Sequence, residues 1–180
     1  MSQRRSRLPQ ILSKRVSFHV GDAMVSKVDM NSHQMHVFRN GKLIRTIPIT
    51  TGQQPKFTTR SGVKVIVEKY RKKRMNSETV GIDPNGPDGY NIAGVEYAMR
   101  ITYSGEFVHA APWSVGSQGH ANVSHGCTGM STANAEWLYS QTLIGDVVEY
   151  TGTDKPMTLT NGIGDWNLPF DQYAAGSALS

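Results

Sequence analysis

The chain has 180 residues, of which 38% are hydrophobic and 18% charged, and its formal net charge is +5. This length allows one domain with a sizeable core and excludes two full domains, and the hydrophobic content excludes a disordered chain. No apolar run approaches the roughly 20 residues of a transmembrane helix. The positive charge favours anionic partners. However, the densest basic cluster, residues 71–74, has only Tyr70 as an aromatic neighbour. This is typical of a solvated surface, so nucleic acid is not an expected partner.

The first half of the chain predicts short strands. Residues 1–14 are polar and basic and are expected to form a linker or a disordered segment. Asn40 and Gly41 lie between two β-rich runs, which is a strong signal for a hairpin turn. Apolar and alternating patterns predict strands at 15–20, 23–29, 33–38 and 63–70.

The second half predicts a lid, two strands and one helix. Residues 75–94 form a long segment with several prolines and glycines, and such loops are often functional. We interpret this segment as a lid that carries Tyr90 over the site, with a surface excursion as the alternative. Residues 96–101 fit a strand or a helix. Strands are predicted at 106–109 and 146–150, and Ser131 is a good N-cap for a helix through Leu138.

Many short strands and one clear helix predict a mostly β fold, either a sandwich or a barrel. Three segments are expected, namely the N-terminal residues 1–14, a main domain at 15–150 and a C-terminal tail at 151–180. Three aromatic residues are expected to pin this tail against the main domain, namely Trp166, Phe170 and Tyr173.

The stretch from His109 to Met130 predicts the functional site. It contains Cys127, the only cysteine, and three of the six histidines. A thiol becomes a nucleophile when a nearby imidazole accepts its proton, so Cys127 is the candidate nucleophile. Gly126 can adopt backbone angles closed to other residues and lets a substrate approach the main chain. The N–H groups of Gly126 and Cys127 are candidate donors to an oxyanion.

Blander interpretations of the cysteine remain open. A lone cysteine is usually a small buried apolar residue. Together with His109, His120 and His125, Cys127 has the residue types of a zinc site, but the paired spacing of such sites is missing. We therefore expect neither a metal nor another cofactor.

The aromatic residues near the cysteine are equally ambiguous. Trp113, Tyr90 and Tyr103 either line the rim of the site, where they would contact a substrate, or fill the core. Ser124 either holds the cysteine loop by a hydrogen bond or is an ordinary turn serine.

These residues resemble the YkuD-type L,D-transpeptidases of bacterial cell walls, most closely those of the actinobacterial branch. The family pattern is a histidine, a spacer of the length seen here, and Ser-His-Gly-Cys, which matches His109 and residues 124–127. The resemblance covers roughly residues 16–175, and further matching motifs lie at 85–90, 103–105, 111–116 and 164–167.

The resemblance implies a β-sandwich-like catalytic domain with one capping helix and a lid over the active site. It implies that Cys127 attacks the bond between meso-diaminopimelate and D-Ala in a tetrapeptide donor stem of peptidoglycan and releases D-Ala. The acyl group then passes to the side-chain amine of an acceptor diaminopimelate, which cross-links two third-position residues. Carbapenems, as covalent β-lactam inhibitors, would acylate the same cysteine.

The resemblance also implies roles for individual residues. His109 would be the base, oriented by a backbone carbonyl. His125, Gly126 and Cys127 would supply oxyanion-hole N–H groups. Substrate contacts are assigned to Tyr90, Tyr103, Trp113, Ser124 and Gly129.

Gly129 departs from the family pattern, which usually has Asn or Arg at this position. That side chain helps to hold the substrate in relatives, so the departure concerns substrate positioning. It also leaves open a wall-binding module that has lost turnover. A carboxypeptidase or endopeptidase that uses the same Cys127 and His109 with water as acceptor is a further alternative.

The implied substrate lies outside the membrane, yet no apolar signal core follows the basic N-terminus. We therefore expect an extracytoplasmic protein of the cell wall or periplasm, of which this chain is a piece without its export segment. An uncleaved cytoplasmic protein is the alternative. Any contact with the membrane would be made through that absent segment.

Overall fold

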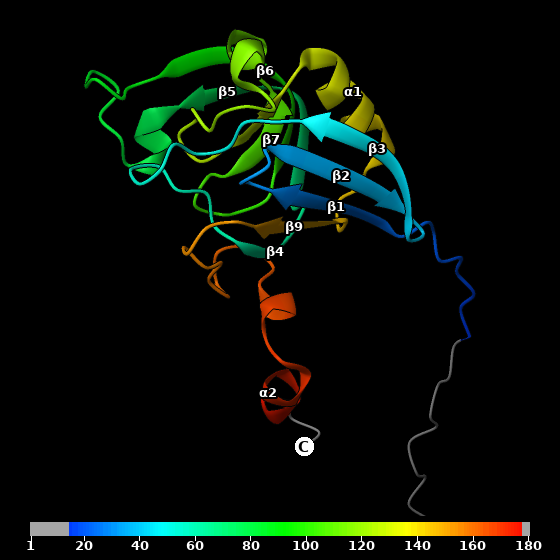
Figure 1. The fold of residues 1–180 in the computed structure, drawn as a ribbon. Coiled ribbons are helices and arrows are strands. Elements are labelled where there is room, and N and C mark those ends of the chain that lie inside the picture. Colours follow the sequence, from blue (N-terminus) through cyan, green and yellow to red (C-terminus); the bar gives the residue numbers. More distant parts are fainter. Residues whose placement is uncertain (1–14, 178–180) are drawn as a thin grey trace, which may run out of the picture.

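The strands surround one hydrophobic core. The computed structural model describes residues 15–177, so the expectations for residues 1–14 and for the last three residues of the tail lie outside the described residues. Within this range the strands form a five-stranded and a four-stranded sheet (Figure 1). One cluster of buried side chains draws on both sheets and on helix α1 (Thr132–Gln141). This mostly β architecture confirms the predicted fold class.

The five-stranded sheet contains the predicted hairpin. Its spatial order is β3 (Lys42–Pro48), β2 (Gln34–Arg39), β1 (Met24–Asp29), β9 (Val147–Thr151) and β4 (Gly62–Val65). Asn40 and Gly41, between β2 and β3, have φ angles of 50° and 78°. Positive φ at both central residues suits a two-residue hairpin turn, because that turn matches the twist of the strands it joins. The hairpin prediction is confirmed.

The four-stranded sheet carries the candidate site. Its order is β5 (Glu68–Asn76), β6 (Asn91–Arg100), β7 (Phe107–Ala110) and β8 (Thr128–Met130). Residues 96–100, which fit a strand or a helix, belong to the strand β6. β7 and β8 run parallel, and the link between them contains the 3-10 helix η2 (Pro112–Ser117).

The helices are short. α1 packs against β6 and β7 and buries Ala135 and Leu138. The Ser131 side chain accepts a hydrogen bond from the Asn134 N–H at 3.3 Å, so the predicted N-cap is confirmed. Three other pieces are η1 (Ser77–Val80), η3 (Asp165–Asn167) and α2 (Phe170–Ala175). Within residues 15–177, none of the helices has the length and apolar character to cross a membrane.

Two strand predictions are wrong. The run 63–70 is divided, because β4 ends at Val65 and β5 begins at Glu68 in the other sheet. The crossing is invisible in the sequence, since valine and isoleucine continue through it. Residues 15–20 form no strand and are exposed. Apolar residues there lack a neighbouring strand, and pairing decides whether such a segment becomes a strand.

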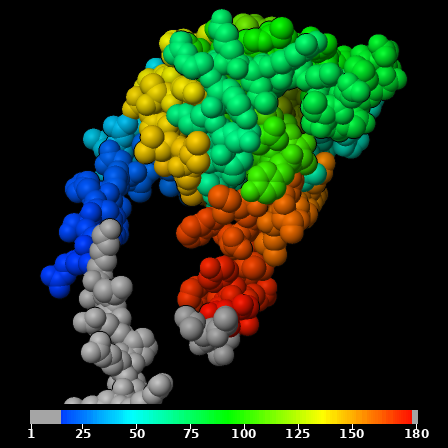
Figure 2. Space-filling model, turned by 180° about the vertical axis from the view of Figure 1, so that it is seen from behind, coloured from blue at the N-terminus to red at the C-terminus, as the bar shows by residue number. Residues whose placement is uncertain are grey.

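The aromatic residues of the tail do not pin it as expected. Trp166, Phe170 and Tyr173 are exposed by 67%, 82% and 54%, and the red end of the tail projects below the body in Figure 2, whereas the orange atoms before it lie against the body. Polar contacts hold the tail instead. Thr153, Lys155 and Met157 form hydrogen bonds with Ser61, and Asn161 forms two with Ser104. The Asn167 side chain accepts from the Val63 N–H at 2.7 Å and donates to the Val63 carbonyl at 2.8 Å. Because β4 is an edge strand, its free backbone groups are available for such an amide.

Ser131→Ala is expected to lower the free energy of unfolding by about 1 kcal/mol, because it removes the N-cap acceptor of α1. Ser140→Ala is the matched control, since Ser140 is exposed in the last turn of the same helix, where alanine has the higher helix propensity. Urea unfolding of both variants provides the measurement. Equal losses would contradict the capping role.

Candidate active site

The pairing of β7 with β8 brings the two candidate reactive residues together. The strands run parallel, with His109 opposite Gly129. Cys127 immediately precedes β8, and both His109 and Cys127 line the same cavity. The Cys127 Sγ hydrogen-bonds to the carbonyl oxygen of Gly105 at 3.6 Å. The thiol therefore lies between the loop that enters β7 and the cavity that it shares with the imidazole.

His109 is held in one tautomer by the backbone. Its Nδ1 lies 2.7 Å from the carbonyl oxygen of Ala110. Because a carbonyl only accepts, Nδ1 carries the proton and Nε2 keeps the lone pair. The imidazole is buried and stacks on Trp113, with 5.9 Å between the ring centroids. This is the geometry expected of a base oriented by a backbone carbonyl.

Burial keeps both reactive groups neutral. It raises the pKa of the Cys127 thiol to about 11 and lowers the pKa of His109 below its ordinary value, because either group would lose water around its charged form. The Phe107 backbone hydrogen bond and the Lys64 charge partly oppose the rise at the thiol. The resting pair at neutral pH is therefore a thiol and a neutral imidazole, so proton transfer has to accompany attack.

Two cavities meet at Cys127. The larger, about 240 Å³, extends toward His109, and the smaller, about 130 Å³, extends toward Tyr103. Trp113 and Tyr103 are exposed by 56% and 60%, so both lie at the rim and do not fill the core. All but one of the predicted site residues line one or both cavities, namely Tyr90, Tyr103, His109, Trp113, Ser124, His125, Cys127 and Gly129.

Tyr90 connects the predicted lid to the cysteine loop. Its ring centroid lies 5.0 Å from that of His125, whose ring also contacts Phe57 at 4.4 Å. Tyr90 and Cys127 line both cavities, which supports the lid interpretation over a surface excursion. Burial raises the pKa of Tyr90 to about 12, so its hydroxyl remains protonated and available as a donor.

Ser124 and Gly126 shape the turn before the cysteine. The Ser124 hydroxyl donates to the Cys127 carbonyl at 2.6 Å and accepts from the Gly126 N–H at 3.1 Å. Gly126 has a φ of +120°, which L side chains rarely adopt. Its N–H was expected to face an oxyanion but is bonded to Ser124 in this structure. The N–H groups of His125 and Cys127 are the other candidate donors.

Gly129 is fixed by packing on two sides. Its N–H and carbonyl pair with the backbone of Thr50, both at 2.9 Å. A Cβ at this position would lie 2.8 Å from the Ala111 Cβ and 3.2 Å from the Thr50 Cγ2. A side chain at position 129 would therefore overlap its neighbours, which gives the departure from the family pattern a structural reason.

Comparisons with known proteins agree with this geometry. A family model described as YkuD, the L,D-transpeptidase catalytic domain, matches residues 24–149. The chain belongs to this family. L,D-transpeptidase 2 of Mycobacterium tuberculosis (strain CDC 1551 / Oshkosh) is 40% identical over 162 residues, which are 89% of this chain and 39% of that relative. The chain therefore spans less than half the length of this curated relative.

Two solved L,D-transpeptidase structures are also similar. One is an LD transpeptidase in complex with imipenem, with a TM-score of 0.71 and 43% identity, covering 73% of this chain and 60% of that one. The other is L,D-transpeptidase 3 from Mycobacterium tuberculosis in complex with a faropenem-derived adduct. Its TM-score is 0.69 at 34% identity, covering 73% of this chain and 61% of that one.

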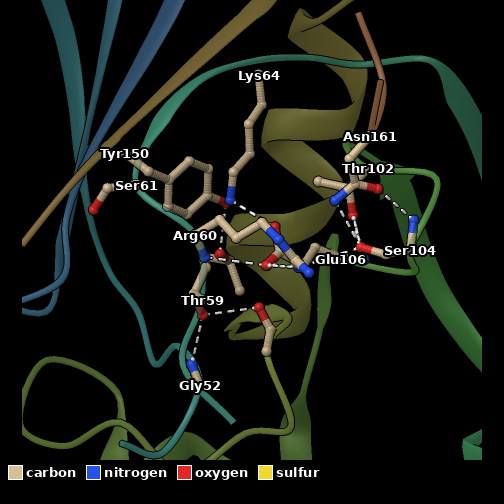
Figure 3. A network of polar contacts seen from close by, with 12 residues as sticks. Gly52, Thr59, Arg60, Ser61, Lys64, Thr102, Ser104, Glu106, Tyr150 and Asn161 are labelled. Carbon is tan, nitrogen blue, oxygen red and sulfur yellow. Dashed lines mark hydrogen bonds and ion pairs between the residues drawn. The ribbon is translucent and has the colours of Figure 1, made fainter. Parts of the chain in front are cut away.

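Sequence reasoning missed a polar network that joins β4 of this L,D-transpeptidase domain to Glu106, the residue before β7 (Figure 3). Lys64 Nζ donates to Glu106 Oε2 at 2.7 Å, and Arg60 donates to Glu106 Oε1 from its backbone N–H and its guanidinium, both at 3.1 Å. Lys64 carries a charged group, yet its side chain is fully buried among the apolar residues of β4. A charged residue at an inward strand position was the signal available in the sequence.

Sequence reasoning also missed the cations of the smaller cavity. Lys73, Arg74 and Arg100 line it together with Cys127. The basic cluster 71–74 was interpreted as a solvated surface, which holds for the exposed Arg71 and Lys72. It does not hold for Lys73, which is half-buried, or for Arg74, which is exposed but lines the cavity.

The rate at which iodoacetamide alkylates Cys127 is expected to rise between about pH 6 and about pH 10 without levelling off near neutrality. The reason is that a thiol with a pKa of about 11 is only partly ionised in this range. Intact-mass spectra give the rate, and Cys127→Ala gives the blank because the chain has no other cysteine. A plateau below about pH 7 would indicate a thiolate–imidazolium pair at rest.

Gly129→Ala is expected to lower the free energy of unfolding by about 1–3 kcal/mol, because the new methyl group overlaps Ala111. Ala111→Gly in the same chain should recover part of the loss, since it removes the nearest obstructing atom. Urea unfolding of the single and double variants tests both statements. A single variant as stable as the wild type would show that this position tolerates a side chain.

Proposed function

We propose that this chain carries a peptidoglycan L,D-transpeptidase activity with Cys127 as the nucleophile. The observation that carries the proposal is the position of Cys127 and His109 on one cavity, with the His109 Nδ1–H bound to the Ala110 carbonyl. This leaves Nε2 as the only ring atom that can accept a proton. Because the chain spans only part of its relatives, its substrates and partners belong to the proposal as well.

The first half-reaction forms an acyl-enzyme. His109 Nε2 accepts the thiol proton while the Cys127 Sγ attacks the carbonyl carbon between meso-diaminopimelate and D-Ala of a donor stem. Negative charge develops on the carbonyl oxygen, for which the N–H groups of His125 and Cys127 are the proposed donors. The intermediate then breaks its C–N bond, and the imidazolium returns the proton to the amine of the departing D-Ala.

The second half-reaction transfers the acyl group. The side-chain amine of an acceptor diaminopimelate attacks the thioester and His109 accepts the amine proton. The C–S bond then breaks, and His109 returns this proton to the departing sulfur, which restores the Cys127 thiol. Two cavities that meet at the sulfur are suited to a donor and an acceptor stem. The cations of the smaller cavity are suited to the carboxylates that such stems carry.

The residues around the cavities have proposed roles in substrate binding. Trp113 and Tyr103 offer exposed aromatic surface at the rim, and Tyr90 offers a protonated hydroxyl beside the sulfur. Ser124 supports the turn that presents the nucleophile. Gly129 acts through its small size, because it lets Thr50 and Ala111 approach β8 closely.

The alternatives differ in the step after acylation. Hydrolysis by a carboxypeptidase or endopeptidase would use the same acyl-enzyme with water as the acceptor. A wall-binding module without turnover rested on Gly129, and the close packing around Gly129 offers a different reason for a glycine at this position. Since peptidoglycan lies outside the membrane, we place the activity in the cell wall or periplasm.

A carbapenem is expected to add once to the wild-type chain and not at all to Cys127→Ala. The thiol attacks the strained β-lactam carbonyl as it attacks a stem peptide, and two similar solved structures contain imipenem or a faropenem-derived adduct. Intact-mass spectra measure the adduct. His109→Gln should slow its formation by about 10²–10⁴-fold if His109 is the base.

A tetrapeptide stem with and without an acceptor amine then separates the alternatives. Cross-linked product that depends on the amine supports transfer, whereas a free tripeptide formed at the same rate in both reactions indicates hydrolysis. Neither an adduct nor a product would contradict the proposed enzyme.

A further inference from the structure

An ion pair is buried beneath the nucleophile loop. Lys64 on β4 and Glu106, which directly precedes β7, are joined by a contact of 2.7 Å, and their side chains are exposed by 0% and 7%. The Lys64 ammonium also lies 3.8 Å from the ring centroid of Tyr150 (Figure 3). Taking two charges out of water is costly, and an apolar pair of similar volume is often as stable. The pair therefore calls for an explanation other than stability.

Glu106 supports the residue before the nucleophile. Its Oε1 accepts the Arg60 N–H at 3.1 Å, which fixes the backbone of the segment that includes Thr59. The Thr59 hydroxyl donates to the Gly126 carbonyl at 2.9 Å. Through these two steps, the Glu106 carboxylate positions the loop on the N-terminal side of Cys127.

Lys64 supports the residue after the nucleophile. Its ammonium packs on the face of Tyr150, whose hydroxyl lies 2.6 Å from the Thr128 Oγ1. Thr128 is the first residue of β8 and follows Cys127 directly. The ion pair is thus linked to both neighbours of Cys127 in the chain. Glu106 reaches Gly126 through Arg60 and Thr59, and Lys64 reaches Thr128 through Tyr150.

The carboxylate also creates an electrostatic difficulty for the reaction. Glu106 follows Gly105, whose carbonyl oxygen accepts the hydrogen bond from the Cys127 Sγ. Burial is the main cause of the raised pKa of the thiol, the Glu106 charge raises it further, and the Lys64 charge lowers it. The Glu106 carboxylate repels the negative charge that the Cys127 sulfur has to carry during the reaction, so a nearby positive charge is needed to offset this repulsion.

We propose that Lys64 and Glu106 are positioning residues for Cys127, in which the carboxylate holds the nucleophile loop and the ammonium cancels its repulsion of the thiolate. This inference rests on Cys127 as the nucleophile of the proposed function. It assigns a task to two residues that lie behind the site and line neither cavity at Cys127.

Other charged or titratable groups near Cys127 stay unchanged in the test. They are Arg60, Lys73, Arg74, Tyr90, Arg100, Tyr103, His109, His125 and Tyr150. Arg60 matters most, because its guanidinium and its N–H both bind the Glu106 Oε1. Glu106 therefore keeps two donors when Lys64 is replaced.

Lys64→Gln removes the positive charge but keeps an amide that can donate to Glu106. Burial lowers the pKa of Lys64 to about 8, so the comparison is made near pH 7, where the wild-type ammonium carries its charge. The rate of Cys127 alkylation by iodoacetamide at this pH is expected to fall by about three- to tenfold, so that its pH profile moves to higher pH. Adding Glu106→Gln removes the opposing charge and should return the profile toward the wild-type position. Lys64→Gln alone leaves the negative charge of Glu106 beside the thiol without its partner. The double variant removes this charge as well, so it restores the charge balance although the native ion pair is still absent.

The control is the exposed ion pair between Lys27 of β1 and Glu149 of β9, joined at 3.0 Å. Lys27→Gln, alone and with Glu149→Gln, should leave the alkylation profile in place. Melting temperatures of all four variants give the structural effect separately. An unmoved profile for Lys64→Gln, or a double variant no closer to the wild type than the single one, would overturn the proposal.

The test does not depend on peptidoglycan. A chain whose alkylation profile shifts as expected but which transfers no stem peptide would contradict the proposed function and leave the electrostatic role of Lys64 and Glu106 standing. A chain that transfers stem peptides but shows no shift would do the reverse.

Discussion

The parallel pairing of β7 with β8 is the constraint on which the site depends. Parallel strands need a long crossover, and here the link of residues 111–127 both makes the crossover and supplies the cysteine loop. The register sets His109 opposite Gly129, and a slip by one residue would turn the side chains of β8 to the other face. Thr50 holds β8 from its other side through two backbone hydrogen bonds. Close packing on both sides of this three-residue strand explains why a glycine stands in its centre.

The charges of the site lie in its support and not on the reacting atoms. Cys127 and His109 are neutral at rest because both are enclosed by protein. Ion pairs behind them join Glu106 to Lys64 and to Arg60, and burial lowers the pKa of Lys64 to about 8. Such a network keeps its geometry while a proton moves between sulfur and imidazole, since none of its hydrogen bonds uses the reacting proton. Residues that hold their positions while the reacting groups gain and lose protons allow the same geometry to serve each acylation cycle.

The sequence predicted those features that depend on neighbouring residues. The Asn40–Gly41 turn and the Ser131 cap are decided within a few residues, and both are confirmed. The family motif led to Cys127 and His109 because their chemistry is tied to a fixed local pattern. Where contacts join distant segments, prediction failed. Nothing local shows that the chain changes sheets between Val65 and Glu68, or that Asn167 of the tail binds the edge of β4.

The polar network failed to emerge from the sequence for the same reason. Lys64 and Glu106 are 42 residues apart in the sequence. Lys64 lies in β4 of the five-stranded sheet, and Glu106 directly precedes β7 of the four-stranded sheet. A lysine in a valine-rich run signals that a partner exists, but only the fold identifies it. The Gly126 N–H is a smaller case, because its bond to Ser124 depends on a side-chain rotamer that the motif does not specify.

A cysteine that is neutral at rest has consequences for selectivity. A thiol with a raised pKa reacts slowly with general electrophiles, because the thiolate is the reactive form. Fast reaction then requires a substrate whose carbonyl reaches the sulfur while its oxygen reaches backbone N–H donors and His109 accepts the proton. The proposed substrates and inhibitors, stem peptides and β-lactams, both offer an acyl carbonyl that can satisfy these demands together. Selectivity in this site therefore comes from the arrangement of donors and acceptors around Cys127, which the paired strands and the buried ion pair maintain, and not from an intrinsically reactive thiol.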